Sequence, residues 1–251
     1  MSPPLSSALI VAAGAAAAGF AQGMTGFAFA SVALSIWAWA LPPQTAAPLA
    51  VFGALLGQLS SLVSFRGGFE WPKILPFVAG GVVGAPIGVF LLHNANTDAF
   101  RLAVGVLLIA YAAFGLFARD LGRVERGGRG LDAFFGGIGG VLGGLGGMAG
   151  FAPAMWTQLR GWTRDLRRAT MQAYNIAMHC VTIALYARTG TLAHADLKQF
   201  LIVAPAMLIP SFLGARVYTR FSEQAFTRVV LIALLGSGAG LAFNALRALA
   251  N

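Results

Sequence analysis

The sequence predicts an all-α polytopic membrane protein made of two inverted repeats, each a re-entrant (broken-helix) hairpin followed by three transmembrane helices. Three observations support this prediction: the composition, an internal duplication and the distribution of basic residues. Of the 251 residues, 58% are hydrophobic and only 10% are charged, whereas soluble domains carry about 25% charged residues. A chain this short cannot bury so much apolar surface in its own core, so a lipid bilayer must solvate it.

Apolar stretches define the predicted elements in order along the chain. The N-terminal repeat (1–117) has a hairpin over 5–41 and helices over 44–65, 74–92 and 101–117. A polar segment at 118–130 is the predicted cytoplasmic linker. The C-terminal repeat (131–251) has a hairpin over 131–162 and helices over 169–187, 199–216 and 226–246.

The duplication is visible in the glycine-rich tips of the two hairpins. Gly-Met-Thr-Gly-Phe-Ala at 23–28 returns as Gly-Met-Ala-Gly-Phe-Ala at 147–152. The third apolar stretch of each repeat also carries two prolines. Internal repeats in an apolar protein are common among secondary transporters.

The opening stretch of each repeat decides the topology. As a helix, the arm from Phe151 to Trp162 would be only about 18 Å long, against about 30 Å of hydrocarbon. We therefore expect a hairpin that dips in and returns, with its irregular tip buried in protein or water. Two full crossings in each opening stretch remain the alternative, and the short second arm argues against them.

The basic residues provide an independent test. With returning hairpins, 13 of the 17 lysines and arginines fall on one side, whereas a single crossing in each opening stretch would divide them nine to eight. The positive-inside rule then places the linker in the cytoplasm and both termini outside. Three crossings per repeat is an odd number, so the repeats insert with opposite orientation.

The two tips are the predicted substrate site, near the membrane midplane. The helix that leaves each tip directs free N–H groups and its positive dipole end toward the centre, an arrangement that binds anions. Glycines let a ligand approach the backbone; the alternative is that they serve helix packing alone. The predicted tip residues are Gln22, Gly23, Met24, Thr25, Gly26 and Phe27, and Gly147, Met148, Ala149, Gly150 and Phe151.

A polar helix face completes the predicted site. Gln172, Asn175, His179 and Thr182 recur at spacings that place them on one face. At the matching positions of the first repeat only Gln58 is polar. Polar groups at membrane depth are costly and tend to line pathways. His179 could bind an anion or relay protons, because imidazole titrates near neutral pH; the alternative is a neutral histidine bonded to a neighbouring helix.

The paired tips and the turns after them resemble the sulfite exporter TauE/SafE family, also called the TSUP transporters. The residues that carry the resemblance lie between 8 and 246: Gly146-Gly-Met-Ala-Gly-Phe-Ala-Pro153, Arg66-Gly-Gly-Phe-Glu-Trp, Arg188-Thr-Gly-Thr-Leu and Gly214-Ala-Arg216. The first tip departs from the family pattern, with Phe29 and Ala30 where a proline often follows the glycines. The resemblance implies movement of small sulfur-containing anions, such as sulfite, sulfonates or sulfoacetate, across the bacterial plasma membrane.

We therefore expect a secondary transporter working by alternating access, with protons or sodium as possible coupling ions and the bilayer as its surroundings. An anion channel of the same architecture is the alternative, and an intramembrane enzyme pairing His179 with a hydroxyl is a remote one. No nucleotide-binding fingerprint occurs in the sequence. No cofactor or metal is expected. A nucleic-acid partner is not expected either, because the net charge of +9 sits in short loops between apolar stretches. The protein is expected to be a monomer or a homodimer.

Overall fold

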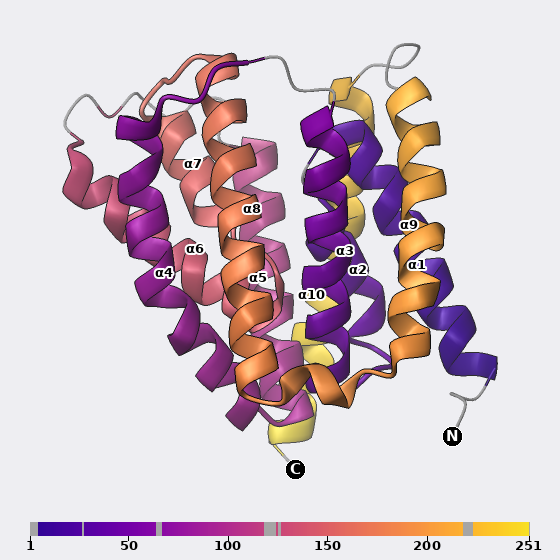
Figure 1. The fold of residues 1–251 in the computed structure, drawn as a ribbon. Helices are drawn as coiled ribbons and strands as arrows, with labels where there is room; N and C mark the ends of the chain where they lie inside the picture. Colours follow the sequence, from indigo (N-terminus) through magenta and orange to yellow (C-terminus); the bar gives the residue numbers. More distant parts are fainter. Residues whose placement is uncertain are drawn as a thin grey trace.

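The computed structural model describes residues 5–26, 28–63, 67–117, 124, 127–217 and 223–250, and these residues form helices and connecting turns (Figure 1). The N-terminal half contains α1 (Leu5–Thr25), α2 (Phe29–Trp37), α3 (Pro43–Val63), α4 (Trp71–Asn94) and α5 (Thr97–Phe117). The C-terminal half contains α6 (Arg129–Gly146), α7 (Phe151–Leu159), α8 (Arg164–Arg188), the 3-10 turn η2 (Thr191–His194), α9 (Leu197–Val217) and α10 (Glu223–Leu249). Most of the linker predicted at 118–130 lies outside the described residues.

The chain breaks at both glycine tips. Gly26 and Gly147 follow α1 and α6 with φ angles of +84° and +81°, a conformation that favours glycine. The Gly147 N–H donates to the carbonyl of Gly143 and closes α6. The arms that follow, α2 and α7, have nine residues each and are about 14 Å long. They are much shorter than α1 and α6, which have 21 and 18 residues.

Six of the described helices are long and apolar enough to cross a membrane: α1, α3, α4, α5, α9 and α10. The prediction of a polytopic α-helical membrane protein is thus confirmed. The set of spans differs from the predicted one in two helices. The 25-residue α8 is absent from it, because its mean hydropathy is lowered by a polar face that the structure buries. The long first hairpin arm, α1, is included instead.

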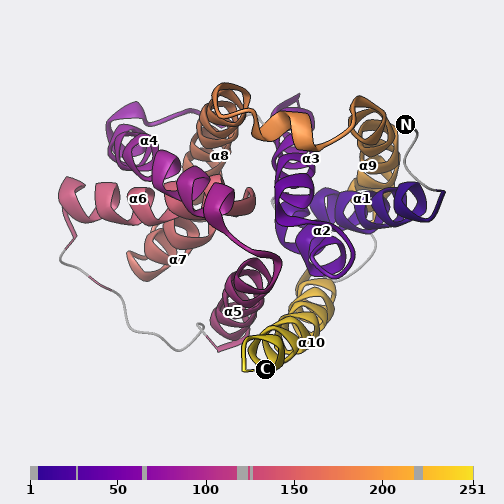
Figure 2. The same cartoon turned by 90° about the horizontal axis from the view of Figure 1, so that it is seen from below.

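The hairpins are exchanged between the halves: the long arm of each hairpin packs against a helix of the other half. Figure 2 shows α4, α6, α7 and α8 on one side of the bundle, α1, α2, α3 and α9 on the other, and the α5–α10 pair along one edge. The α6 helix of the second half therefore packs along α4 of the first, and α1 packs along α9. Small residues allow the backbones to touch: a Cβ on Gly84 would collide with the carbonyl of Gly137, and one on Gly23 with that of Ser211.

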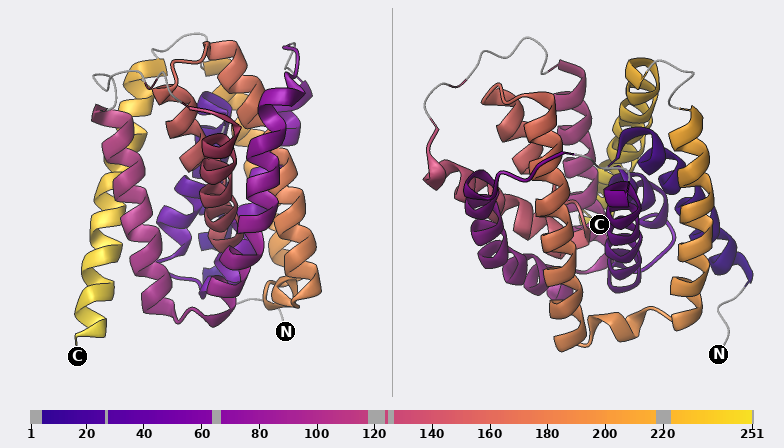
Figure 3. Two further views of the ribbon diagram at one scale, coloured as in Figure 1. Left: turned by 90° about the vertical axis from the view of Figure 1, so that its left-hand side faces the viewer. Right: turned by 45° about the horizontal axis from the view of Figure 1, so that its top comes forward.

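Both ends of the chain lie at one end of the bundle. Figures 1 and 3 show the start of α1 and the end of α10 there, with the end of α5 and the start of α6 at the opposite end. The N-terminal half therefore begins at the end of the bundle at which the C-terminal half finishes.

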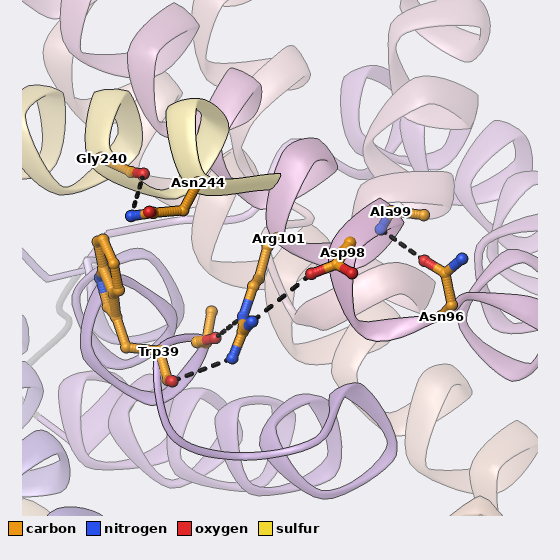
Figure 4. Close-up of polar contacts among 8 residues, drawn as sticks. Trp39, Asn96, Asp98, Ala99, Arg101, Gly240 and Asn244 are labelled. Carbon is orange, nitrogen blue, oxygen red and sulfur yellow. Dashed lines mark hydrogen bonds and ion pairs between the residues drawn. The ribbon is translucent and has the colours of Figure 1, made fainter. Parts of the chain in front are cut away.

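An arginine anchors the outer end of each short arm. Arg101 of α5 donates to the carbonyls of Ala38 and Trp39 at the end of α2, at 2.9 and 3.1 Å, and pairs with Asp98 (Figure 4). A cation at a helix C-terminus is favourable because the dipole is negative there. At the end of α7, Arg160 pairs with the buried Asp132 of α6 at 2.9 Å. The C-terminal ends of both short arms are therefore held by an arginine, and their N-terminal ends point into the bundle.

Candidate functional site

A cavity of about 30 Å³ lies where the second glycine tip meets α8, α5 and the first turn of α2. Its polar lining comes from α8, which contributes Asn175 and His179, and from Ser31 of α2. The remaining lining residues are Ala30, Tyr111, Gly147, Met148, Gly150 and Phe151. No acidic side chain of the described residues lines the cavity.

Asn175 and His179 lie one turn apart on α8 and face this cavity. Their side chains are only 4% and 2% exposed, yet Asn175 Oδ1 and His179 Nδ1 have no hydrogen-bond partner among the described residues. Buried polar atoms in proteins are nearly always paired, and leaving one unpaired costs about 1–3 kcal/mol. Arg167, Thr170 and Thr182 of α8 also carry an unpaired buried atom, but among the described residues only Asn175 and His179 combine an unpaired atom with a place in the cavity lining.

The second tip brings the positive end of α7 to the cavity. Gly150 precedes the first turn of α7, and no side chain caps that turn. Few backbone donors remain in it, because Pro153 has no N–H and the Phe151 N–H lies 3.3 Å from the carbonyl oxygen of Met148. The helix dipole still favours negative charge here, but direct contacts fall mainly to the side chains of α8.

The first tip is closed by its own side chain. Gln22 Oε1 accepts the Phe29 N–H at 3.1 Å, and Gln22 Nε2 donates to the Gly26 carbonyl at 2.8 Å. Thr25 Oγ1 donates to the carbonyl of Ala21 at 2.8 Å, within its own helix. Gln22 thus takes the position at the start of α2 that an anion would take. The equivalent residue of the second tip is Gly146, which has no side chain to do the same.

The structure therefore separates the predicted site residues into two sets. Six of them line the cavity: Gly147, Met148, Gly150, Phe151, Asn175 and His179. Eight do not: Gln22, Gly23, Met24, Thr25, Gly26, Ala149, Gln58 and Gln172. Phe27 lies outside the described residues. Gly23 packs against the backbone of Ser211, which matches the packing alternative for that glycine.

Three lining residues were not predicted: Ala30, Ser31 and Tyr111. Ser31 enters because the first turn of α2, which follows the first tip, also lies beside the second tip. The Tyr111 ring packs edge-on against Phe151, with centroids 5.3 Å apart. A tyrosine in the middle of the apolar stretch 101–117 is the signal that could have identified this residue, since hydroxyls at membrane depth are uncommon.

The described residues contain no cluster of His, Cys, Asp and Glu that could hold a metal ion. The buried carboxylate of Asp132 lies near the start of α6 and accepts from Trp156 Nε1 at 2.7 Å as well as from Arg160. This group holds the two arms of the second hairpin together and does not line the cavity.

Broken helices, hairpins that pack on the other half and a cavity lined by buried, unpaired polar groups are features of multi-pass membrane transporters. The chain belongs to the sulfite exporter TauE/SafE family, whose profile matches residues 10–241. The resemblance recognised in the sequence is thereby confirmed, and a transporter family agrees with the prediction that the chain is not an enzyme. No curated protein and no solved structure matches the chain.

Proposed function

We propose that the protein is a secondary transporter of small anions, and that the anion binds in the cavity at the second tip. The observation that carries this proposal is the pair of buried, unpartnered groups on Asn175 and His179. The α7 dipole and the lack of an acidic lining residue favour a negative ligand. Family membership supports a sulfur-containing anion such as sulfite, a sulfonate or sulfoacetate.

The size of the cavity favours a ligand of a few non-hydrogen atoms. A water needs about 10–15 Å³ of such space, so a cavity of about 30 Å³ has room for little more than two. An inorganic oxyanion fits this description better than a longer sulfonate, for which Phe151 and Tyr111 would have to move apart.

We further propose that the two halves are inverted repeats in a bacterial plasma membrane, with the linker in the cytoplasm and both termini outside. The reciprocal packing of α1 on α9 and of α6 on α4 supports the inversion. The orientation rests on the basic residues. Single cysteines at Gly128 and at Asn96, in a Cys180→Ala background, test it with an impermeant thiol reagent. Gly128→Cys should react only from the cytoplasm and Asn96→Cys only from outside; the reverse pattern refutes the orientation.

Transport itself is tested in proteoliposomes with sulfite, sulfoacetate, taurine and lactate as candidate substrates. We expect saturable flux with counterflow, and a KM raised at least tenfold by Asn175→Ala. The matched control is Asn94→Ala, since Asn94 is an exposed asparagine at the end of α4. Equal KM values for the parent and both variants would refute the site. Flux that neither saturates nor shows counterflow would favour the channel alternative.

A further inference from the structure

A layer of three buried glutamines lies beside the cavity, on the side toward the end where α3 finishes and α8 begins. Gln22, Gln58 and Gln172 are 1%, 3% and 6% exposed. Gln172 lies one turn before Asn175 on the same face of α8, so it is the next polar side chain on the way from the cavity to that end. None of the three lines the cavity.

Hydrogen bonds connect the three glutamines through the backbone carbonyls of Gln58 and Gly26. Gln172 Nε2 on α8 donates to the backbone carbonyl of Gln58 on α3. Gln58 Nε2 donates in turn to the Gly26 carbonyl at 3.3 Å, and Gln22 Nε2 donates to the same carbonyl at 2.8 Å. The layer thus connects α8 through α3 to the first tip.

The first of these bonds crosses between the two groups of helices. α3 lies in the group with α1, α2 and α9, whereas α8 lies in the group with α4, α6 and α7 (Figure 2). At the opposite end, Gln44 Nε2 of α3 donates at 3.3 Å to the carbonyl of Ala95, which follows α4. Thr45 Oγ1 of α3 donates at 3.1 Å to the carbonyl of His194, in the turn η2 between α8 and α9. Polar contacts therefore join neighbouring helices toward both ends of the bundle.

We propose that the hydrogen bond from Gln172 to Gln58 is the gate between the substrate cavity and the cytoplasmic end, and that it breaks when the two helix groups separate. This inference rests on the proposed function. An uncharged bond suits a gate because it is weak enough to break in each cycle. It also leaves no buried charge without a partner when it opens, whereas an ion pair would. The amide N–H groups freed by opening are donors along the path of an anion.

The gate makes a different prediction from direct substrate binding. If Gln172 held the substrate, its replacement would weaken binding and leave the access to the cavity unchanged. If Gln172 is the gate, its replacement exposes the cavity to one side of the membrane. Access is measured by the reaction of a thiol placed in the cavity, which requires no transport.

The experiment uses Ser31→Cys as the reporter in a Cys180→Ala background, because Cys180 is an exposed thiol. An anionic, impermeant methanethiosulfonate is added to the cytoplasmic face of inside-out vesicles. We expect Gln172→Leu to accelerate labelling of the reporter at least tenfold. The control is Gln199→Leu, since Gln199 is also buried and hydrogen-bonded but lies at the opposite end, where its Oε1 accepts the Asp196 N–H.

Faster labelling with Gln172→Leu alone supports the gate. No acceleration, or equal acceleration in both variants, overturns it. If Gln172→Leu does not insert, Gln172→Asn takes its place, because an amide one methylene shorter does not reach the Gln58 carbonyl, and the same outcomes apply. If no anion is transported but Gln172→Leu still accelerates labelling, the proposed function is rejected and the gate stands. If transport is normal but Gln172→Leu does not accelerate labelling, the gate is rejected and the proposed function stands.

Discussion

Replacing Gly150 with alanine tests whether the Asn175 amide binds the anion. Gly150 has a φ of −71°, which alanine adopts freely, so the backbone accepts the change. A Cβ there would lie 2.8 Å from Asn175 Oδ1 and 3.0 Å from Asn175 Nδ2. Such contacts are too short to persist, so the Asn175 amide must leave its present position beside the cavity by several tenths of an ångström.

The size of the effect follows from the contact that is lost. A hydrogen bond to a charged group contributes about 1.5–3 kcal/mol, and each 1.4 kcal/mol changes Kd about tenfold. We therefore expect Gly150→Ala to weaken anion binding about 10- to 100-fold. The purified protein can be titrated with sulfite or another accepted anion, with thermal shift or calorimetry as the measurement of Kd.

Gly26→Ala is the matched control in the other tip. Gly26 has a φ of +84° and nothing within 4 Å of an added Cβ. Alanine there costs about 1–2 kcal/mol of backbone strain, so the unfolding temperature should fall while Kd stays the same. If Gly26→Ala weakens binding as much as Gly150→Ala, the two tips are equivalent and the single-site interpretation is wrong.

Three further predictions follow from named contacts. His179→Gln keeps a hydrogen-bonding group at the cavity but changes its shape and position; Kd for the anion should rise about tenfold, and an unchanged Kd would mean that His179 serves packing. Tyr186→Phe leaves the buried Gly144 carbonyl without its 2.7 Å bond and should lower the free energy of unfolding by about 1–3 kcal/mol, with Kd unchanged. Asp132→Asn removes the ion pair with Arg160, which is only 20% exposed, and should cost about 3 kcal/mol in thermal unfolding assays.

Composition and periodicity were sufficient to predict the helical membrane fold and the polar face of α8. The breaks in the opening stretches coincide with the duplicated glycines, because a positive φ is tolerated by glycine and by few other residues. The asymmetry of the tips was not predicted, although one position shows it. Gln22 in the first tip corresponds to Gly146 in the second, and whether a glutamine binds substrate or caps its own helix depends on side-chain geometry.

The sequence also did not predict which helices pack against each other. Glycine-rich faces on α1, α4 and α6 show that close neighbours exist, but they do not say which helix is the neighbour. The contacts between Gly84 and Gly137 and between Gly23 and Ser211 pair residues from different halves. Such pairing depends on the shape of the whole bundle, which no local pattern encodes.

The exchanged hairpins also dictate when the protein can be completed during synthesis. Helix α1 is made well before α9, yet Gly19 of α1 packs against the carbonyl of Met207 in α9. Contacts so distant along the chain form slowly, because a long intervening loop must close. The face of α1 that packs on α9 therefore stays against lipid until α9 is made, whereas its contacts with α2 and α3 can form earlier.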